Sequence, residues 1–250
     1  MNELVSIITP TYHSVAFITE TVASVQAQTH SNWELLLIDD CSQDGTYALL
    51  QELAAQDARI RVFRNATNQG AAVTRNVGIT EAKGRYLAFL DADDCWLPEF
   101  LSRMIAFSQA NNYPFVFSSY ERMDELGNRL YPDIIAPEKI NYRTLLKANK
   151  IGCLTAFLDL ELAGKKQMPL IRKRQDMGLW LAYLKEIPYA YSIAEPLAKY
   201  RVHTQSLSSN KRQLIQYQWE LYRQVEQLSV IESTYYMLQW MVRGYLKYRN

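Results

Sequence analysis

The stretch Gly84–Pro98 reads GRYLAFLDADDCWLP, and it decides the fold class of the chain. Its apolar part, Tyr86–Leu90, is short and continuous, as in a strand that is buried on both faces. Three aspartates follow within residues 91–94 (DADD). Helical spacing of apolar residues then predicts a helix over Pro98–Asn111, and a proline near the first helical position does not weaken it. A buried strand, an acidic loop and a helix are expected in that order.

The same alternation extends through the first 120 residues. Further strands are predicted at Leu4–Thr9, Leu35–Ile38, Ile60–Arg64 and Phe115–Ser119, and further helices at Phe17–Gln28, Thr46–Ala55 and Ala71–Glu81. This alternation predicts a Rossmann-like α/β fold, with a mostly parallel sheet and helices on both of its faces. Ligands of such sheets bind at the carboxyl ends of the strands. The candidate site therefore consists of the residues that follow the strands, namely Pro10, Thr11, Tyr12, Asp39, Asp40, Asp91, Ala92, Asp93 and Asp94.

The pattern is less regular after about residue 120. Gly127-Asn128 predicts a turn between two short strands, and Ser192–Tyr200 predicts a late strand. Residues 211–250 are rich in aromatic side chains and almost free of glycine and proline, which predicts one or two helices. We therefore expect a domain over residues 1–210, with halves at 1–120 and 121–210, and a helical segment over 211–250.

Composition excludes several classes of protein. The net charge of +1 over 250 residues gives no electrostatic footprint for nucleic acid. Three cysteines without a CxxC pair argue against a disulfide framework or a cysteine zinc site and favour a reducing compartment. No signal peptide and no apolar run of about 18 residues is found, so we expect no transmembrane helix and at most peripheral membrane contact.

The acidic loop suggests metal chemistry. Alternate residues at a strand end point to the same side, so Asp91 and Asp93 are expected to converge. Two neighbouring carboxylates repel unless a cation or hydrogen bonds neutralise them. Oxygen ligands suit Mg²⁺ or Mn²⁺, and such ions commonly bridge carboxylates and substrate phosphates. The alternative is a solvated turn whose acids cap the next helix, but the position directly after a buried strand favours the metal site.

Six stretches together resemble family 2 glycosyltransferases of the GT-A fold. They are SIITPTY (Ser6–Tyr12), LLLIDDCSQDGT (Leu35–Thr46), NQGAAVTRNVGI (Asn68–Ile79), GRYLAFLDADDCWLP (Gly84–Pro98), QDMGLWL (Gln175–Leu181) and YRVHTQSLS (Tyr200–Ser208). No single stretch is specific, but their order and spacing are. The resemblance implies an inverting enzyme of the hexosyltransferase type that uses a nucleotide-sugar, with residues 1–120 binding the donor and 121–210 the acceptor.

The resemblance also implies roles for single residues. Pro10, Thr11 and Tyr12 would line the nucleoside pocket, and Asp40 would bind the base. Asp91-Ala92-Asp93 would be the DXD motif with Asp93 as main metal ligand, and His203 would lie near the diphosphate and metal. Asp176 would be the catalytic base. In this scheme Asp176 accepts the proton of an acceptor hydroxyl as that oxygen attacks the anomeric carbon. The family usually has Glu-Asp where this chain has Gln175-Asp176, which puts contacts to the acceptor in doubt.

The resemblance further implies the substrates and their setting. A UDP-sugar is the expected donor, and a glycan or lipid-linked hydroxyl in bacterial capsule or lipopolysaccharide synthesis is the expected acceptor. The QxxRW signature of processive synthases is absent, so we expect one or few sugars per encounter. The expected location is the cytoplasm, including the inner face of the membrane.

Two arginines and the C-terminal segment can each be interpreted in more than one way from the sequence. Arg75 either lies on the polar face of an amphipathic helix, with Val73 and Val77 as its core face, or lies near the diphosphate or the carboxylate cluster. Arg201 either binds a phosphate or pairs with an acid. The segment 211–250 either packs on the catalytic domain, forms a homodimer interface, or lies on a membrane surface. Trp180 is expected in the core.

Other enzymes and a binding protein are the competing functions. A dehydrogenase needs GxGxxG after the first strand and a P-loop NTPase needs GxxxxGK[ST]; neither occurs. A sugar nucleotidyltransferase would be expected to have a glycine-rich loop where Pro10–His13 stands. A non-catalytic nucleotide-sugar-binding protein would not need Asp91, Asp93 and Asp176 together.

Overall fold

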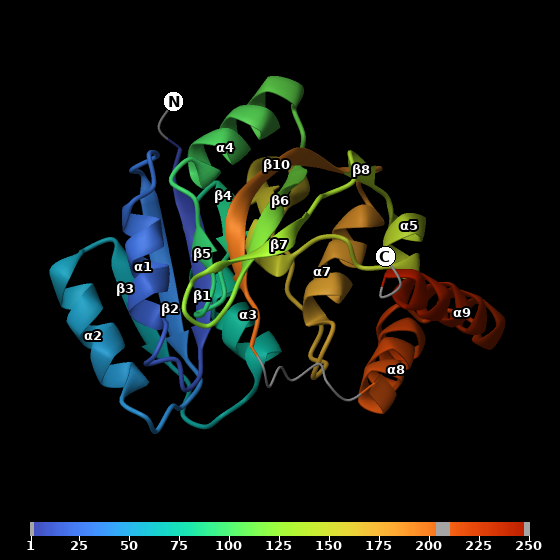
Figure 1. The fold of residues 1–250 in the computed structure, drawn as a ribbon, viewed down its shortest axis with the longest axis horizontal. Helices are drawn as coiled ribbons and strands as arrows, with labels where there is room; N and C mark the ends of the chain where they lie inside the picture. Colours follow the sequence, from blue (N-terminus) through green and yellow to red (C-terminus); the bar gives the residue numbers. More distant parts are fainter. Residues whose placement is uncertain (1–2, 204–210, 248–250) are drawn as a thin grey trace.

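Among the residues that the structure describes, ten strands form one sheet, and helices cover both of its faces (Figure 1). The structure is a computed structural model that describes residues 3–203 and 211–247. The strands are β1 (Val5–Thr11), β2 (Trp33–Asp39), β3 (Ile60–Arg64), β4 (Tyr86–Phe89), β5 (Cys95–Trp96), β6 (Phe115–Met123), β7 (Arg129–Ile134), β8 (Lys139–Ile140), β9 (Phe157–Asp159) and β10 (Ala190–Arg201). The helices are α1 (Ile18–Gln26), α2 (Thr46–Gln56), α3 (Ala71–Glu81), α4 (Phe100–Asn111), α5 (Tyr142–Lys147), α6 (Leu160–Ala163), α7 (Gln175–Leu184), α8 (Lys211–Glu220) and α9 (Val230–Lys247), with shorter turns at η1 (Cys153–Thr155) and η2 (Leu221–Val225).

The sheet is mostly parallel, as predicted. Its order is β3-β2-β1-β4-β9-β6-β10-β5, with β7 beside β6 and β8 beside β10. Strands β3, β2, β1 and β4 are mutually parallel, and β6 is parallel to β10. Strand β9 lies antiparallel between β4 and β6, so all six of these longer strands run in one direction. The sequence pattern missed β9 because three residues are too few to show a period.

The expected boundary between the two halves, at residue 120, falls inside β6. The sheet therefore continues through that point. The turn predicted at Gly127-Asn128 does join two strands, because β6 pairs with β7 across it. The late strand is also present as β10, two residues longer at its start and one at its end than predicted. The predicted start of the helical segment at 211 agrees with α8, and residues 248–250 lie outside the described part of the chain.

Alternate residues of the inner strands separate into two apolar cores. Ile8 and Leu36 face one cluster, whereas Ile7 and Leu35 face the other. Strands β1 and β2 are buried almost throughout because helices cover both faces of the sheet. Their side chains therefore read as continuous apolar runs with no alternation, which is how they were predicted.

Helix α3 lies unusually close to the sheet. A Cβ atom at Gly78 would meet Ile8 Cγ2 at 2.7 Å and Ile38 Cδ1 at 2.9 Å. Only glycine permits that approach without displacing these side chains. The close contact brings the N-terminal turns of α3 towards the carboxyl ends of β1 and β2.

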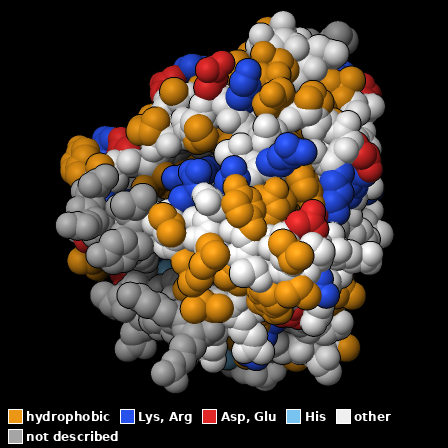
Figure 2. All heavy atoms as spheres, turned by 90° about the vertical axis from the view of Figure 1, so that its right-hand side faces the viewer, with side chains coloured by type: hydrophobic (Ala, Val, Ile, Leu, Met, Phe, Trp, Pro, Cys, Tyr) orange, Lys and Arg blue, Asp and Glu red, His pale blue; other side chains and the backbone are white. Residues whose placement is uncertain are grey.

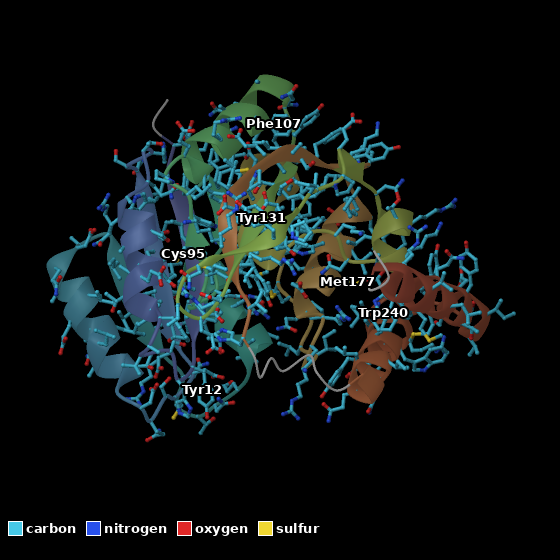
Figure 3. All side chains as sticks on the ribbon, viewed as in Figure 1. Tyr12, Cys95, Phe107, Tyr131, Met177 and Trp240 are labelled. Carbon is cyan, nitrogen blue, oxygen red and sulfur yellow. The ribbon has the colours of Figure 1, made fainter. Side chains whose placement is uncertain are left out.

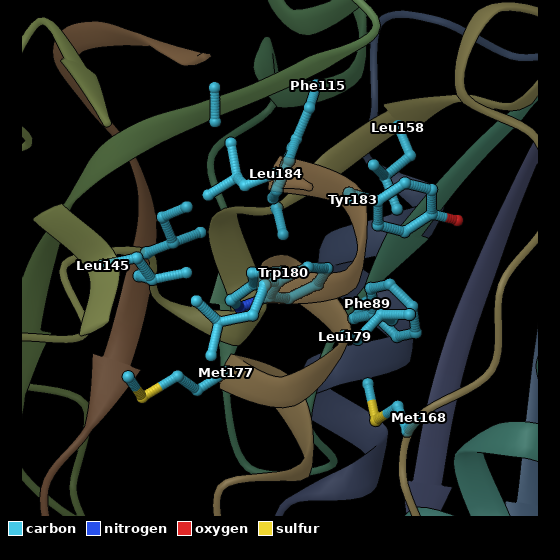
Figure 4. Close-up of a cluster of buried hydrophobic side chains, with 14 of the residues drawn as sticks. Phe89, Phe115, Leu145, Leu158, Met168, Met177, Leu179, Trp180, Tyr183 and Leu184 are labelled. Carbon is cyan, nitrogen blue, oxygen red and sulfur yellow. The ribbon is translucent and has the colours of Figure 1, made fainter. Parts of the chain in front are cut away.

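Helix α7 is the centre of the core in the second half of the chain. Trp180 is fully buried, as predicted, and its ring lies 5.6 Å from that of Phe89 and 5.2 Å from that of Phe115 (Figure 4). The C-terminal helices pack on this core, because Met177 of α7 and Trp240 of α9 belong to the same apolar cluster (Figure 3). The interpretation that this segment packs on the catalytic domain is therefore confirmed for one of its faces.

The three cysteines are free. Over residues 3–203 and 211–247, no helix combines the length and the hydropathy that crossing a bilayer requires.

Candidate active site

The carboxyl ends of β1, β2 and β4 lie side by side. Thr11 is in register with Asp39, and the Asp40 amide donates to the Thr11 carbonyl at 2.8 Å. On the other side of β1, the Leu90 amide donates to Ile8 at 3.0 Å. The residues after these three strands therefore meet at one edge of the sheet, as the topology predicted. Figure 3 shows Tyr12 at this edge, at the bottom of the view.

Arg75 and Asp91 form an ion pair in this edge. The Nη2 atom of Arg75 contacts Asp91 Oδ1, although Arg75 comes from α3 and Asp91 from the loop after β4. Arg75 is only 7% exposed, and its Nε atom has no hydrogen-bond partner among the described residues. Arg75 therefore lies at the carboxylate cluster, which was one of its two predicted positions.

The buried face of α3 differs from the amphipathic alternative. Val73 and Val77 are only partly buried, whereas Asn76 is buried with Arg75. The amide group of Asn76 donates to the Met168 carbonyl at 2.9 Å and accepts from the Met168 amide at 2.8 Å. The apolar spacing was misleading because a loop from the second half of the chain supplies polar partners for this face.

Asp93 is the carboxylate that pairs with histidine. His203 Nε2 lies 2.7 Å from Asp93 Oδ2, and His203 Nδ1 lies 3.5 Å from Glu125. Burial raises the pKa of Asp93, and the neighbouring carboxylate of Asp91 raises it further. The structure thus brings together all three residues that the resemblance assigned to the metal. The rest of that motif, 204–208, lies outside the described residues.

The carboxylates fit an open cation site better than a closed one. No three acidic, histidine or cysteine side chains in the described part of the chain are arranged to enclose a metal ion. The side chains of Asp91 and Asp93 are nevertheless 31% and 36% exposed, and burial first and the charge of Asp91 second raise the pKa of Asp93. Mg²⁺ and Mn²⁺ suit such a site, because they are commonly held by one or two carboxylates plus water and phosphate oxygens.

Asp94 has a different role from its neighbours. It is 1% exposed, and its Oδ1 atom accepts the backbone N–H of Arg201 at 2.8 Å. Burial raises its pKa well above the ordinary range, with Asp93 and Asp91 adding to the effect. The Thr21 hydroxyl lies 2.9 Å from the carbonyls of both Ala92 and Asp94, which fixes the loop. The alternation at the strand end predicted that Asp91 and Asp93 converge and assigned no role to Asp94, whose burial against Arg201 the structure adds.

Arg201 supports the acidic loop from behind. It is 2% exposed. Its Nε donates to the Asp93 carbonyl at 2.8 Å, and its Nη1 donates to the carbonyls of Asp124 and Glu125 at 3.2 and 3.1 Å. Its Nη2 donates to the carboxylate of Glu20 at 2.5 Å. Pairing with an acid is therefore the interpretation that the structure shows. Arg201 joins α1, the loop after β4 and the β6–β7 turn.

Asp40 orders the loop that leads into α3. Its carboxylate accepts hydrogen bonds from Asn65 Nδ2 at 2.7 Å and from the backbone N–H groups of Gln69 at 2.9 Å and Gly70 at 2.8 Å. Gly70 takes a positive φ of 86°, which favours glycine. Asp40 is 4% exposed, so this loop is its main partner, and its contact with a base stays a prediction.

Among the residues predicted to bind the nucleoside, Tyr12 supplies an exposed aromatic ring. Thr11 is 1% exposed and its hydroxyl donates to the Ile38 carbonyl at 3.3 Å, while Ala92 is 6% exposed and Pro10 is partly exposed. Tyr12 is 50% exposed and stacks on His13 with ring centroids 4.1 Å apart. Tyr12 is thus the member of this set with a free aromatic surface.

Asp176 reaches the same site from the second half of the chain. It stands in the first turn of α7, and Asn149 Nδ2 donates to its Oδ2 at 3.2 Å. Burial disfavours the charged form of Arg75, but Asp91, with Asp176 and other neighbours, outweighs burial and raises the pKa of Arg75. Asp176 is therefore near enough to Arg75 to act on its charge, and its role as the base stays a prediction.

Cys153 belongs to this site, although nothing in its sequence context indicated it. It lies in η1 and near enough to Arg75, Asp91 and Asp176 to interact electrostatically with all three. Burial raises the pKa of this thiol well above the ordinary value. A neutral thiol is therefore expected at the centre of the charged cluster.

The mostly parallel sheet has an acidic loop at its carboxyl edge, and comparison with known proteins identifies the family. The family model described as "Glycosyl transferase family 2" matches residues 6–160. The chain is 43% identical over 237 residues to a putative teichuronic acid biosynthesis glycosyltransferase, TuaG, of Bacillus subtilis, covering 95% of this chain and 94% of that protein. The chain belongs to glycosyl transferase family 2 and is a transferase.

A second relative and a solved structure agree with that assignment. The chain is 37% identical over 246 residues to WfgD of Escherichia coli, a UDP-Glc:α-D-GlcNAc-diphosphoundecaprenol β-1,3-glucosyltransferase, covering 98% of this chain and 95% of that protein. The structure of Staphylococcus aureus TarS (1–349) with UDP-GlcNAc superposes with a TM-score of 0.72 at 18% identity, over 95% of this chain and 71% of that one. The predicted GT-A fold and family are confirmed.

Proposed function

We propose that this enzyme transfers a hexose from a UDP-sugar to a hydroxyl of a lipid-linked glycan, with inversion at the anomeric carbon. The observation that carries the proposal is the ion pair of Arg75 with Asp91 at the carboxyl edge of the sheet, with Asp93 as a neighbour of Asp91 and Asp176 as a neighbour of Arg75. The carboxylates of the acidic loop come from the first half of the chain and the remaining one from the second. Such a site can hold a donor and activate an acceptor at the same time.

The first 120 residues would bind the donor. The exposed ring of Tyr12 offers a stacking surface for the base, and Asp40 and the loop that it orders lie at the next strand end. Arg75 supplies a buried positive charge beside Asp91. WfgD is named for UDP-glucose, and the TarS structure holds UDP-GlcNAc, which supports a UDP-sugar here.

A divalent cation, Mn²⁺ or Mg²⁺, fits the carboxylates of Asp91 and Asp93, with His203 in reach of Asp93. When bound, such an ion neutralises the charge that develops on the leaving diphosphate. The archaeal mannosyltransferase PcManGT, whose structure holds GDP-mannose and Mn²⁺, shares the fold with a TM-score of 0.57 at 15% identity over 88% of this chain and 62% of that one.

Residues 121–210 would present the acceptor, with Asp176 as the general base. Asp176 is partly exposed and stands at the N-terminal end of α7. Its carboxylate would accept the proton of the acceptor hydroxyl as the oxygen attacks the anomeric carbon on the face opposite the diphosphate. One displacement of this kind inverts the configuration. Asn149 holds the carboxylate, and Arg201 holds the loop that carries Asp93.

The relatives support a role in bacterial surface polysaccharide synthesis. WfgD acts on a sugar linked to diphosphoundecaprenol and TuaG is assigned to teichuronic acid synthesis. We therefore place the enzyme in the cytoplasm at the inner face of the membrane, where nucleotide-sugars and a lipid-linked acceptor meet.

Isothermal titration tests the donor site. Wild type and Asp93→Ala are titrated with UDP, with and without Mn²⁺. We expect binding that needs both the cation and Asp93. Asp176→Asn should keep UDP affinity and lose at least 100-fold in transfer, the lower end of what a general base contributes. Failure to bind UDP, GDP, CMP and dTDP under all metal conditions would contradict the proposal. Unchanged transfer in Asp176→Asn would remove Asp176 as the base.

A further inference from the structure

The outer face of α9 carries an apolar stripe that no described residue covers. Ile231, Tyr235, Leu238 and Val242 are spaced four, three and four residues apart, so they lie on one side of the helix. They are 82%, 49%, 54% and 57% exposed. We refer to these four residues as the α9 stripe. The opposite side of α9 is used for packing, because Ser233 and Met237 are buried there.

The stripe is part of a larger apolar surface. Half of the large apolar side chains that are exposed in the described chain belong to α8 and α9, and Ile215 and Trp219 of α8 are among them. Figure 2 looks onto this side of the molecule and shows groups of apolar side chains over much of it, with charged side chains of both signs between them. Exposed apolar side chains that gather on one face in this way mark an interaction site.

Cations lie beside the stripe. Arg143 and Lys147 of α5 line a groove of about 440 Å³ together with Tyr235 and Tyr236 of α9. Arg143 and Arg243 are exposed, Lys147 is partly exposed, and none of the three forms an ion pair with a described acid. They are therefore available to an anionic partner.

The acids of this region are already engaged. Glu232 also lines the groove, but its carboxylate accepts from the backbone N–H of Ser229 at 2.9 Å and from the Ser229 hydroxyl at 2.7 Å. Glu226 pairs with Lys185 at 2.9 Å and accepts the Tyr142 hydroxyl at 2.5 Å. Glu232 keeps its negative charge, because Ser229 is a neutral partner. The cations Arg143, Lys147 and Arg243 outnumber it, so the net unpaired charge next to the stripe is positive.

We infer that the α9 stripe, with Arg143 and Lys147, docks on the surface of an anionic phospholipid bilayer. An amphipathic helix with aromatic and aliphatic residues on one face and cations beside them lies in the plane of such a surface. Anionic headgroups complement the cations while acyl chains receive the stripe. The surface of a second copy would present the same excess of cations over acids, so an anionic bilayer complements the net charge better. The inference rests on the proposed function only in explaining why the enzyme would bind a bilayer, namely to stay near a lipid-linked acceptor.

Vesicle flotation of the full chain tests the inference. The probes are vesicles of phosphatidylcholine alone and vesicles that also contain phosphatidylglycerol, without donor or acceptor. Wild type should bind the anionic vesicles, and raised salt should weaken the binding. Ile231→Ser combined with Leu238→Ser should weaken it about tenfold or more, because both exposed side chains lose their apolar contact. Arg143→Gln combined with Lys147→Gln should cost roughly fivefold for each charge removed.

Matched controls lie elsewhere on the surface. Leu126→Ser removes a side chain that is 88% exposed in the β6–β7 turn, and Lys83→Gln removes an exposed cation between α3 and β4, so neither belongs to α5, α8 or α9. Neither should change vesicle binding. Wild type that ignores anionic vesicles, or binding that survives both double changes, would overturn the inference. So would a wild-type dimer in sedimentation that Ile231→Ser with Leu238→Ser makes monomeric. The flotation assay contains no donor or acceptor, so a loss of vesicle binding is measured independently of any loss of sugar transfer.

Discussion

Arg75 of α3 holds the carboxylate of Asp91, so the helix that packs closest to the sheet also neutralises the first acid of the loop after β4. The contact depends on Gly78, one turn further along α3, because any larger residue would push the helix away from Ile8 and Ile38. Packing of the core and charge at the site are thus set by the same helix.

Arg75→Met should therefore damage both stability and catalysis. The buried guanidinium is lost and Asp91, which is partly exposed, stays without its partner. We expect a loss of about 1–2 kcal/mol in unfolding free energy, because solvent screens part of this charge. We expect kcat/KM to fall about 100-fold, the size of effect that a misplaced or unpaired charge has at an active site. Denaturant unfolding and initial rates measure the two effects.

Arg61→Met is the matched control for Arg75→Met. Arg61 forms ion pairs with Glu34 and Glu81 on β2 and α3 but none with the acidic loop. It should lower stability by a similar or smaller amount and leave kcat/KM within about twofold of wild type. Equal catalytic losses in both variants would mean that Arg75 acts only through the fold.

Asn149→Asp should slow transfer without weakening the donor complex. The substitution keeps the oxygen that accepts the Ile151 amide at 3.1 Å, but it replaces the N–H donor to Asp176 with a second carboxylate. We expect kcat to fall about tenfold to 100-fold, since a hydrogen bond to a charged group is lost. The UDP dissociation constant from titration should stay unchanged. A rise in that constant with kcat intact would show that Asn149 belongs to the donor site instead.

Asp94→Asn should stabilise the protein above the ordinary aspartate pKa of about 3.9. Burial first, and the carboxylates of Asp93 and Asp91 second, raise the pKa of Asp94 in the folded chain. The folded state therefore binds the proton more tightly than the unfolded state, and wild-type stability falls as pH rises through that raised pKa. Asparagine keeps an oxygen for the Arg201 amide and carries no charge.

The measurement for Asp94→Asn is the melting temperature across a pH series. We expect the variant to exceed wild type by about 2–4 °C at neutral pH, which corresponds to about 1 kcal/mol in a chain of this size. The difference should shrink as pH falls. A constant difference at every pH would mean that the effect comes from packing and not from ionisation.

Asp40→Asn should loosen the loop before α3. One carboxylate oxygen that accepts backbone N–H groups becomes an amide donor, so the Gly70 or Gln69 N–H loses its partner. We expect a loss of about 2 kcal/mol and faster hydrogen exchange at those two amides. Asp44→Asn, which affects an exposed acid that accepts from Thr46, is the comparison and should cost less than 1 kcal/mol. Protected Gly70 and Gln69 amides in Asp40→Asn would refute this role.

Much of the first half of the chain was predictable because its elements are long and its inner strands are buried on both faces. Strand β3 and helix α3 agree with the predicted bounds to the residue. Helix α4 starts at Phe100, two residues after the prediction, because Pro98 precedes the first turn without entering it. The meeting of the strand ends followed from the parallel topology alone.

Long-range partners were not predictable from local pattern. Nothing near Arg201 in the sequence indicates that its partner is Glu20, and nothing near Asn149 points to Asp176. Alternation at the strand end distinguished Asp94 from Asp91 and Asp93, but its hydrogen bond to the backbone of Arg201 could not be predicted. Short elements such as β5, β8 and η1 give no periodic signal, and so the position of Cys153 was missed.

The contacts of Arg201 have a consequence for engineering acceptor specificity. Its side chain joins Glu20, the carbonyl of Asp93 and the β6–β7 turn, and its backbone is held by Asp94. Chimaeras that graft an acceptor half from a relative would separate this arginine from both of its acids if the crossover is placed near residue 120. Recombination between family members is therefore expected to give active hybrids only under one condition. Glu20, Asp94 and the residue at position 201 must come from the same parent, or the residues at these positions must be compatible.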